Sequence, residues 1–213
     1  TIQHDAWLIN DAPTYRGREY QGHKIEGLLL NSRMANALFN DTNKLTQVLW
    51  KYPDTDAWDP DRNTSEFIST LPEYRSRGLL AVTVNLQGAS PFGYYRLPEF
   101  RKLMKSLGID VPDETMWAGL PEPESQPWHN SAFDAEGELV QPFMARLTQI
   151  LEATDDLGMV VILGCFYFGQ DERLKDENAV KAAVTNACDW LLEHNHRNVV
   201  VEINNECNVQ RYE

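Results

Sequence analysis

Four short apolar runs, separated by longer segments with helical periodicity, constrain the fold of this chain most strongly. They are residues 26–33, 79–86, 159–166 and 199–205. Most of the runs are continuously apolar rather than alternating, which is typical of strands buried on both faces of a parallel sheet. Strands that alternate with helical segments indicate consecutive βα units. We therefore expect a parallel sheet of four strands.

The segments before the second, third and fourth runs each carry one apolar stripe at helical spacing. The stripes are Phe67, Ile68, Leu71 and Tyr74; Phe143, Leu147, Ile150 and Leu151; and Val180, Ala183, Val184, Ala187, Trp190 and Leu191. Gly78 and Gly158 stand just before the second and third runs, where a helix often ends on a residue that tolerates a left-handed conformation. Three helices that pack on the sheet are predicted.

Two regions fall outside this repeat. Residues 1–25 include the strand-like stretch 6–15 with an Asn-Asp turn, and we expect a hairpin that caps the floor of the domain. Residues 87–134 follow the second strand, are rich in Pro and aromatic residues, and are far longer than an ordinary connection. Loops of this length are usually functional. We predict a functional loop with a short helix near residues 99–107.

Four consecutive βα units predict half of a (β/α)8 TIM barrel, a fold that takes roughly 250 residues when complete. We expect residues 26–213 to form strands one to four of this α/β barrel, after the cap formed by residues 1–25. The sequence stops shortly after Glu206, without the helix that should follow the fourth strand. A truncated half barrel is therefore expected.

The charge of the chain restricts its partners. A formal net charge of -13 and a pI near 4.8, without a basic cluster, would repel a phosphate backbone, so no nucleic acid is expected. The longest apolar stretch, residues 159–168, is too short to cross a bilayer, and we predict no membrane partner. The sequence leaves the compartment and the oligomeric state open.

Neither a metal nor a cofactor is expected from the residue pattern. Cys165, Cys188 and Cys207 form no CxxC pair, so free thiols are the preferred interpretation. Four aspartates at positions 54, 56, 59 and 61 resemble a calcium loop at first sight, but they lack the spacing and the closing Glu of an EF-hand. We interpret them as a solvated loop that caps the first helix.

In a barrel the carboxyl ends of the strands carry the active site. The candidate residues there, including two from the long loop, are Asn31, Arg33, Asn85, Trp128, His129, Tyr167, Asn205 and Glu206. Amides and aromatic rings suit sugars, whose hydroxyl groups need fixed hydrogen bonds and whose faces stack on rings. For Trp128 and His129 two interpretations stay open: a substrate platform, or a loop anchor in which Trp128 packs and Asn130 caps a turn.

Glu206 suits the acid of a two-carboxylate mechanism. Retaining glycoside hydrolysis needs two carboxyl groups roughly 5–5.5 Å apart, one of them protonated. A Glu at a strand end among amides and rings is partly desolvated, which raises its pKa toward that role. The alternative is an ion pair at the rim. Glu202, four residues earlier, is expected to be a buried charge paired with a basic residue.

The segment Ile203-Asn204-Asn205-Glu206 resembles the Asn-Glu signature of clan A retaining glycoside hydrolases of the cellulase and mannanase type. The resemblance implies that Glu206 is the acid/base, that Asn205 contacts the sugar 2-hydroxyl, and that the nucleophilic Glu comes from strand seven. Residues 7–15 are similar to the hairpin that precedes the first strand in those families. This resemblance covers the architecture of the chain, whereas its chemically specific part is the fourth strand.

Three positions depart from the family pattern. Cys207 stands where Pro usually follows, Asn85 stands where an Arg is usual, and residues 165–167 replace a third-strand end that contains His. We hypothesise that Arg33 takes over the missing Arg's task of orienting the nucleophile. A divergent family would account for these differences.

The sequence thus predicts a glycosidase with a carbohydrate substrate, and the fragment alone is expected to be inactive. A carbohydrate-binding barrel that has lost catalysis is the main alternative. A lyase or isomerase that uses Glu206 as a base is a third possibility.

Overall fold

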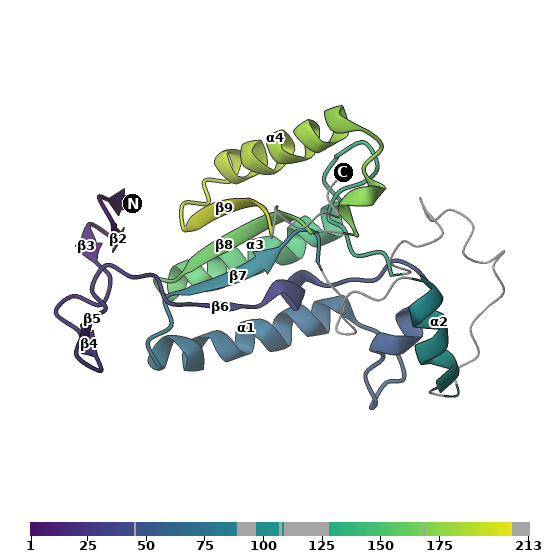
Figure 1. Ribbon diagram of the computed structural model, residues 1–213, viewed down its shortest axis with the longest axis horizontal. Coiled ribbons are helices and arrows are strands. Elements are labelled where there is room, and N and C mark those ends of the chain that lie inside the picture. The colour runs from purple at the N-terminus through teal and green to yellow at the C-terminus, as the bar shows by residue number, and fades with distance from the viewer. Residues whose placement is uncertain (45, 89–96, 107, 109–127, 168, 206–213) are drawn as a thin grey trace.

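The computed structural model describes residues 1–44, 46–88, 97–106, 108, 128–167 and 169–205 (Figure 1). Its main sheet has four parallel strands in sequential order, as expected. They are β6 (Asn31–Arg33), β7 (Ala81–Asn85), β8 (Val160–Phe166) and β9 (Val199–Asn204). The described strands form an open sheet and not a closed barrel, so the fold established here is mixed α/β.

One long helix lies between each pair of successive strands, which confirms the helices predicted from the apolar stripes. These are α1 (Pro60–Ser76), α3 (Gln141–Asp156) and α4 (Glu177–Glu193). A shorter helix, α2 (Leu97–Ser106), lies in the segment after β7, close to the predicted position. The described residues also include three 3-10 turns: η1 (Ala35–Leu38), η2 (Gln47–Trp50) and η4 (Asp171–Arg173).

Local sequence determines where the long helices begin and end. Asp59 caps α1 by accepting hydrogen bonds from the backbone N–H groups of Asp61 and Arg62 at 3.0 and 2.9 Å, and Asp176 caps α4 in the same way. Beyond the other ends of α1 and α3, Gly78 and Gly158 have φ angles of 94° and 63°. Glycine reaches these left-handed conformations at low cost, which lets the chain turn back into a strand.

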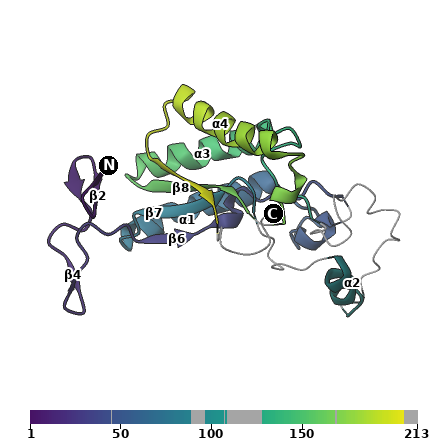
Figure 2. The same cartoon turned by 45° about the horizontal axis from the view of Figure 1, so that its top comes forward.

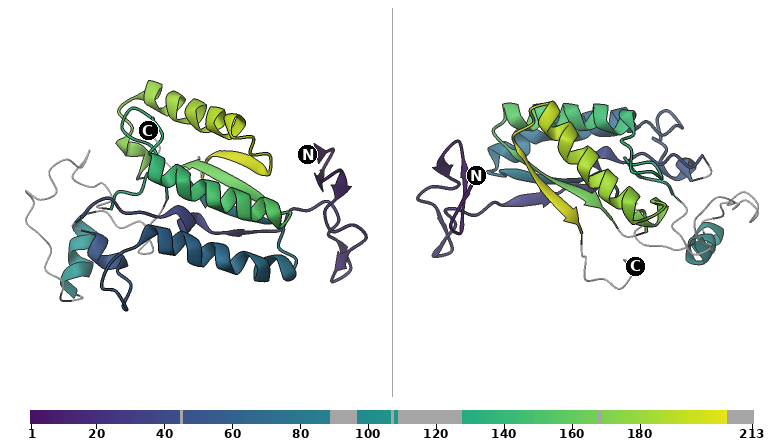
Figure 3. Two further views of the ribbon diagram at one scale, coloured as in Figure 1. Left: turned by 180° about the vertical axis from the view of Figure 1, so that it is seen from behind. Right: turned by 90° about the horizontal axis from the view of Figure 1, so that it is seen from above.

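All three long helices pack on the same face of the sheet (Figures 1 and 3). Alternate side chains of β7 and β8, such as Val82, Val84, Val161 and Leu163, form a single buried cluster with residues of the helices. The helix residues in this cluster include Leu71, Phe143, Leu147, Ile150, Leu151, Ala183 and Ala187. Burying each large side chain contributes roughly 1.5–3 kcal/mol. This one-sided core leaves the opposite face of the sheet to other side chains.

The N-terminal segment forms small antiparallel hairpins at the end of the molecule where β6 begins (Figures 1 and 2). Their strands are β1 (Ile2–Gln3), β2 (Ala6–Ile9), β3 (Ala12–Pro13), β4 (Glu19–Tyr20) and β5 (His23–Lys24). The predicted Asn-Asp turn is present, with positive φ angles of 50° at Asn10 and 63° at Asp11. Tyr15 attaches this segment to the domain, because its hydroxyl donates to the Gly78 carbonyl at 2.9 Å.

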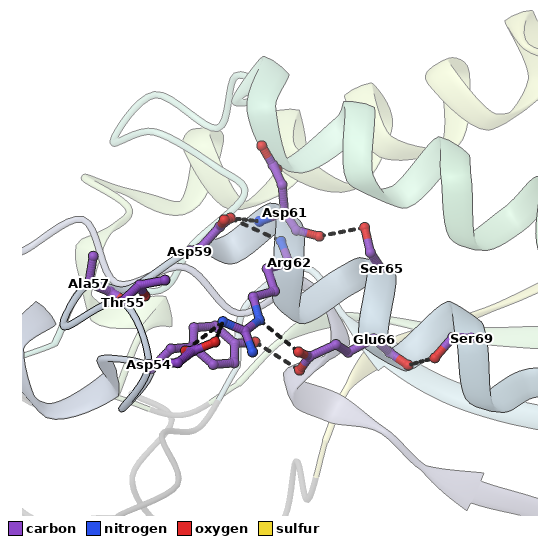
Figure 4. A network of polar contacts seen from close by, with 10 residues as sticks. Asp54, Thr55, Ala57, Asp59, Asp61, Arg62, Ser65, Glu66 and Ser69 are labelled. Carbon is purple, nitrogen blue, oxygen red and sulfur yellow. Dashed lines mark hydrogen bonds and ion pairs between the residues drawn. The ribbon is translucent and has the colours of Figure 1, made fainter.

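The four aspartates at positions 54 to 61 make contacts within the protein, and Asp59 caps α1 as predicted. Figure 4 shows Asp54, Asp59 and Asp61. Asp54 accepts two hydrogen bonds from Arg62, at 2.8 and 2.9 Å, while Asp56 pairs with Lys51. The Arg62 guanidinium also lies over the Tyr52 ring, 3.8 Å from its centroid. Within the described residues, no group of three or more His, Cys, Asp or Glu side chains is arranged to hold a metal ion.

Cys165 is buried and Cys188 is half-buried, both as free thiols, in agreement with the sequence-based interpretation. Burial raises the pKa of the Cys165 thiol to about 12. Cys207 lies outside the described residues. Among the helices that the structure describes, none combines the length and the apolar character needed to span a bilayer.

Substitution of Gly137 tests how the loop before α3 docks on α4. A Cβ atom at Gly137, whose φ is 85°, would lie 2.2 Å from the Ala179 carbonyl oxygen. We expect Gly137→Ala to lower the free energy of unfolding by about 2–4 kcal/mol, from left-handed strain and overlap together. Urea denaturation measures this change.

Gly158→Ala is the matched control, because Gly158 also has positive φ but no neighbouring atom within 4 Å of the added methyl group. It should cost only about 1 kcal/mol. Equal losses of unfolding free energy in the two variants would show that Gly137 is not in close contact with α4.

Candidate functional site

A row of polar side chains crosses the sheet near the carboxyl ends of the strands, on the face opposite to the helices. Asn85 on β7, Gly164 on β8 and Glu202 on β9 are register partners, so they lie at one level. A Cβ atom built on Gly164 would stand 2.6 Å from Asn85 Oδ1 and 3.4 Å from Glu202 Oε2. The missing side chain at Gly164 therefore leaves room for both neighbours to extend over β8.

The hydrogen-bonding groups of this row are buried and lack partners in the part of the chain that the structure describes. Asn85 is 2% exposed, and neither its Nδ2 nor its Oδ1 has a hydrogen-bond partner. Glu202 Oε2 and Asn204 Oδ1 are in the same condition. Buried polar groups are nearly always hydrogen-bonded in folded proteins. The atoms concerned are one donor, Asn85 Nδ2, and three acceptors, Asn85 Oδ1, Glu202 Oε2 and Asn204 Oδ1.

The surroundings of Glu202 differ from the predicted ion pair. The sequence suggested a charge paired with a basic residue, but no basic side chain forms an ion pair with Glu202 within the described residues. The reason lies in the register, because the neighbours of Glu202 across the sheet are Gly164 and then the neutral Asn85.

A buried amide network fixes the loops beside this row. Gln87, just after β7, donates through Nε2 to Ser131 Oγ at 3.1 Å and to the Gln170 carbonyl at 3.2 Å. Gln170, just after β8, accepts through Oε1 from the Asn130 N–H at 3.0 Å and from Arg173 Nε at 3.2 Å. These contacts join the segments that follow two neighbouring strands. Among the described residues, Gln87 Oε1 is left without a partner.

Asp41 ties the segment after β6 to the same region. It is fully buried, and its Oδ1 accepts hydrogen bonds at 2.9 Å from the N–H groups of both Asn43 and His129. Its Oδ2 accepts from the Thr46 hydroxyl and, at 2.8 Å, from Trp50 Nε1. Four donors satisfy this carboxylate, so its role is to hold the loops in place and not to react.

The structure supports the loop-anchor interpretation of Trp128, and the substrate-platform interpretation is wrong. Trp128 is 0% exposed and belongs to a small core with Phe39, Trp50 and Met104. Its ring meets that of Trp50 edge to face, 6.4 Å between centroids. A fully buried ring has no free face on which a sugar could stack. The Oδ1 of Asn130 accepts a hydrogen bond from the Asn40 N–H at 3.1 Å, which joins two segments that are distant in the sequence. A turn cap by Asn130 stays a prediction.

His129 lies half-buried beside this anchor. Its backbone carbonyl accepts hydrogen bonds from Thr42, through the N–H at 2.9 Å and the hydroxyl at 3.3 Å. Burial lowers the pKa of its imidazole to about 4, and the nearby charge of Arg173 acts in the same direction. The imidazole is therefore neutral near pH 7 and can donate or accept a hydrogen bond. A substrate-binding role for His129 stays a prediction.

Asn31 does not lie at the carboxyl end of its strand, contrary to the prediction. It begins β6 and pairs with Ala81, the first residue of β7, so it stands at the amino ends of the strands. The difference arises because regular pairing starts only at Asn31, whereas the apolar run starts at residue 26. Arg33 is exposed and pairs with Thr83, one step below the polar row. The chain then leaves the sheet and enters η1.

Asn36, on η1, is the residue of this segment that reaches the carboxyl end. Its Oδ1 is buried without a partner in the described part, and it lies near Gly88. The sequence analysis placed the end of β6 correctly but did not anticipate the 3-10 turn that follows it. For this reason it missed Asn36.

Three further predicted residues, Asn85, Tyr167 and Asn205, lie at the carboxyl edge. Asn85 ends β7 and Tyr167 follows β8 directly, buried with 4% exposure. Asn205 follows β9, and its N–H donates to the Phe166 carbonyl at 3.4 Å. Asn85 and Asn205 thus come from strands on either side of β8. Glu206 lies outside the described residues.

Asp171 is a further candidate, to which the sequence gave no role beyond its position after the third strand. Its Oδ1 is buried without a hydrogen-bond partner in the described residues. Burial raises the pKa of the carboxyl group to about 6, with the Glu172 charge adding to the rise. A carboxyl group that titrates near neutral pH can exchange protons with a bound ligand.

Comparison with protein-family models, with curated proteins and with solved structures gave no match to this chain. Its function is therefore inferred from the chemistry of the site.

The raised pKa of Asp171 predicts a specific pH dependence of stability. Between its ordinary value of 3.8 and about 6, the folded chain holds this proton more tightly than the unfolded chain, so ionisation opposes folding as the pH rises. Asp171→Asn removes that penalty. We expect the variant to be more stable than the parent by about 1 kcal/mol at pH 8, after allowance for solvent screening, with a smaller difference at pH 4.

Urea denaturation at the two pH values measures the change, with the exposed Glu138→Gln as the charge-matched control. A gain that is identical at pH 4 and pH 8 would show that Asp171 does not titrate in this range.

Proposed function

We propose that residues 26–213 form the first half of a (β/α)8 barrel and that the complete protein is a retaining glycoside hydrolase with Glu206 as general acid/base. The sequential strand order supports the barrel part of this proposal. In a doubly wound sheet the strand order reverses and helices cover both faces. Here each strand is added beside the previous one, and α1, α3 and α4 share one face.

The observation that carries the proposal is the polar row near the carboxyl end of β9, the strand that Glu206 follows in the sequence. Asn85, Glu202 and Asn204 present buried hydrogen-bonding atoms without partners in the described chain. Each such group costs about 1–3 kcal/mol when it stays unsatisfied. A ligand rich in hydroxyl groups would recover this energy, and sugars are such ligands. In barrel enzymes, substrates bind at this end of the strands.

The mechanism follows from two carboxyl groups on opposite sides of the glycosidic bond. Glu206 gives its proton to the leaving oxygen while a carboxylate from a later strand attacks the anomeric carbon, so the glycosidic bond breaks as a glycosyl ester forms. Glu206, now ionised, takes a proton from water, and the resulting attack releases the sugar and the nucleophile. In this proposal the second carboxylate comes from strand seven, as the resemblance to clan A hydrolases implies.

Besides the acid Glu206, the chain supplies side chains that bind the substrate in this proposal. Asn205, by resemblance to clan A hydrolases, contacts the sugar 2-hydroxyl. Asn85 stands where those families carry an Arg, and its amide atoms, which have no partner among the described residues, give it a direct role in binding hydroxyl groups. Tyr167 and His129 complete the proposed substrate-binding set. Arg33 keeps its hypothetical role in orienting the nucleophile.

A carbohydrate-binding barrel without catalysis is the second candidate. It is favoured by the same amide-rich row, because Asn85 and Asn204 can bind hydroxyl groups whether or not an acid is present. The full-length sequence distinguishes the two, since the enzyme needs a Glu at the end of its seventh strand and the binding protein does not.

Glu206→Gln in the full-length protein tests the acid role. With aryl β-glycosides that have poor leaving groups, turnover should fall about 10²- to 10⁴-fold because the departing oxygen is no longer protonated. With a 2,4-dinitrophenyl leaving group, which departs without a proton, the first step should be much less affected. Steady-state and burst kinetics on the two substrates measure the contrast.

The exposed Glu193→Gln serves as the control, since it makes the same chemical change at the far end of α4. Wild-type turnover of Glu206→Gln on poor leaving groups would refute the assignment.

A further inference from the structure

A cavity of about 500 Å³ lies at the other end of the sheet, between the N-terminal segment and the end of α1. Four arginines line it: Arg16, Arg18, Arg75 and Arg77. No Asp or Glu is among the described residues that form its wall. This is unexpected in a chain with 32 acidic and 19 basic residues.

Two of the arginines have structural partners. Arg75 Nε donates to the Leu157 carbonyl at 2.9 Å, at the C-terminus of α3, where the helix dipole favours a positive charge. Arg77 pairs with Glu73 one helical turn earlier, at 2.6 Å. These contacts explain why basic residues end α1, but they involve neither Arg16 nor Arg18.

Arg16 and Arg18 bring further positive charge to the cavity. Both are exposed, and neither forms an ion pair with a described residue. The Glu26 carboxylate, which feels the Arg16 charge, is already engaged by the Gly17 N–H at 2.6 Å and by Lys24 at 3.1 Å.

Tyr15 lies close to arginines of both segments that line the cavity. Its hydroxyl donates to the Gly78 carbonyl inside the cavity wall. Burial raises the pKa of this phenol, and the charges of Arg75 and Arg18 both oppose the rise. Arg75 on α1 and Arg18 in the N-terminal segment therefore both act on the Tyr15 hydroxyl.

We propose that this cavity binds a phosphate-bearing small molecule. The guanidinium fork matches the oxygens of a phosphoryl group in a bidentate manner, and Arg16 and Arg18 together balance a dianion. A volume of about 500 Å³ falls within the usual range of small-molecule sites. The site lies at the amino ends of the strands and does not depend on the proposed hydrolase activity.

Calorimetric titration with inorganic pyrophosphate at low ionic strength tests the proposal on the 213-residue chain. We expect saturable binding with one site per chain. In the double variant Arg16→Gln/Arg18→Gln the affinity should be about tenfold or more lower. Both arginines are exposed, so their loss should weaken ligand binding rather than the packing of the core. Circular dichroism verifies that the variant is folded.

The matched control is Lys105→Gln/Lys181→Gln, which removes the same charge from exposed positions on α2 and α4. It should bind pyrophosphate like the parent. Absence of saturable binding, or an equal loss in the control, would overturn the proposal.

Titration with inorganic phosphate and with a sugar phosphate separates the two sources of the same chemistry. Tighter binding of the sugar phosphate identifies an organic ester as the ligand, and tighter binding of inorganic phosphate identifies the free anion. Either result supports the site. If sulfate and chloride bound as tightly as the phosphate ligands, the binding would be general electrostatic attraction, and this would contradict the proposal.

Discussion

The apolar contact between one face of β7 and β8 and the three long helices is the interaction on which the rest of the structure depends. Val82, Val84, Val161 and Leu163 all point to that face and are completely or almost completely buried. Because strand side chains alternate, this burial forces the residues between them to the opposite face. The same contact that stabilises the sheet therefore determines which side chains are free to form a site.

Along that opposite face the residue types change toward the carboxyl ends. Ala81 and Val160 stand near the beginning of the strands, while Asn85, Glu202 and Asn204 follow near their ends. Gly164 lets the long polar side chains on both sides extend over β8. The polar row reduces stability and offers hydrogen bonds to a ligand, and this combination is the physical basis of the proposed sugar site.

Periodicity was sufficient to predict the four strands and the helices α1, α3 and α4, because both follow from repeated local patterns. It could not place Asn31, since the start of β6 depends on where β7 begins. It left Trp128 ambiguous, because its burial results from contacts with Phe39 and Trp50, far away in the sequence. The environments of Asp171 and Glu202 likewise depend on tertiary neighbours. The sequence therefore gave no signal, beyond their position near strand ends, that one oxygen of each would lack a partner among the described residues.

The stereochemistry of hydrolysis tests the central claim most directly. Proton NMR can follow the anomeric configuration of the first product that the full-length protein releases from a β-linked oligosaccharide. A two-carboxylate retaining mechanism predicts that the product first appears as the β anomer and then mutarotates. Release of the α anomer first, or no hydrolysis of any β-linked sugar, would contradict the assignment of Glu206 as the acid/base of a retaining hydrolase.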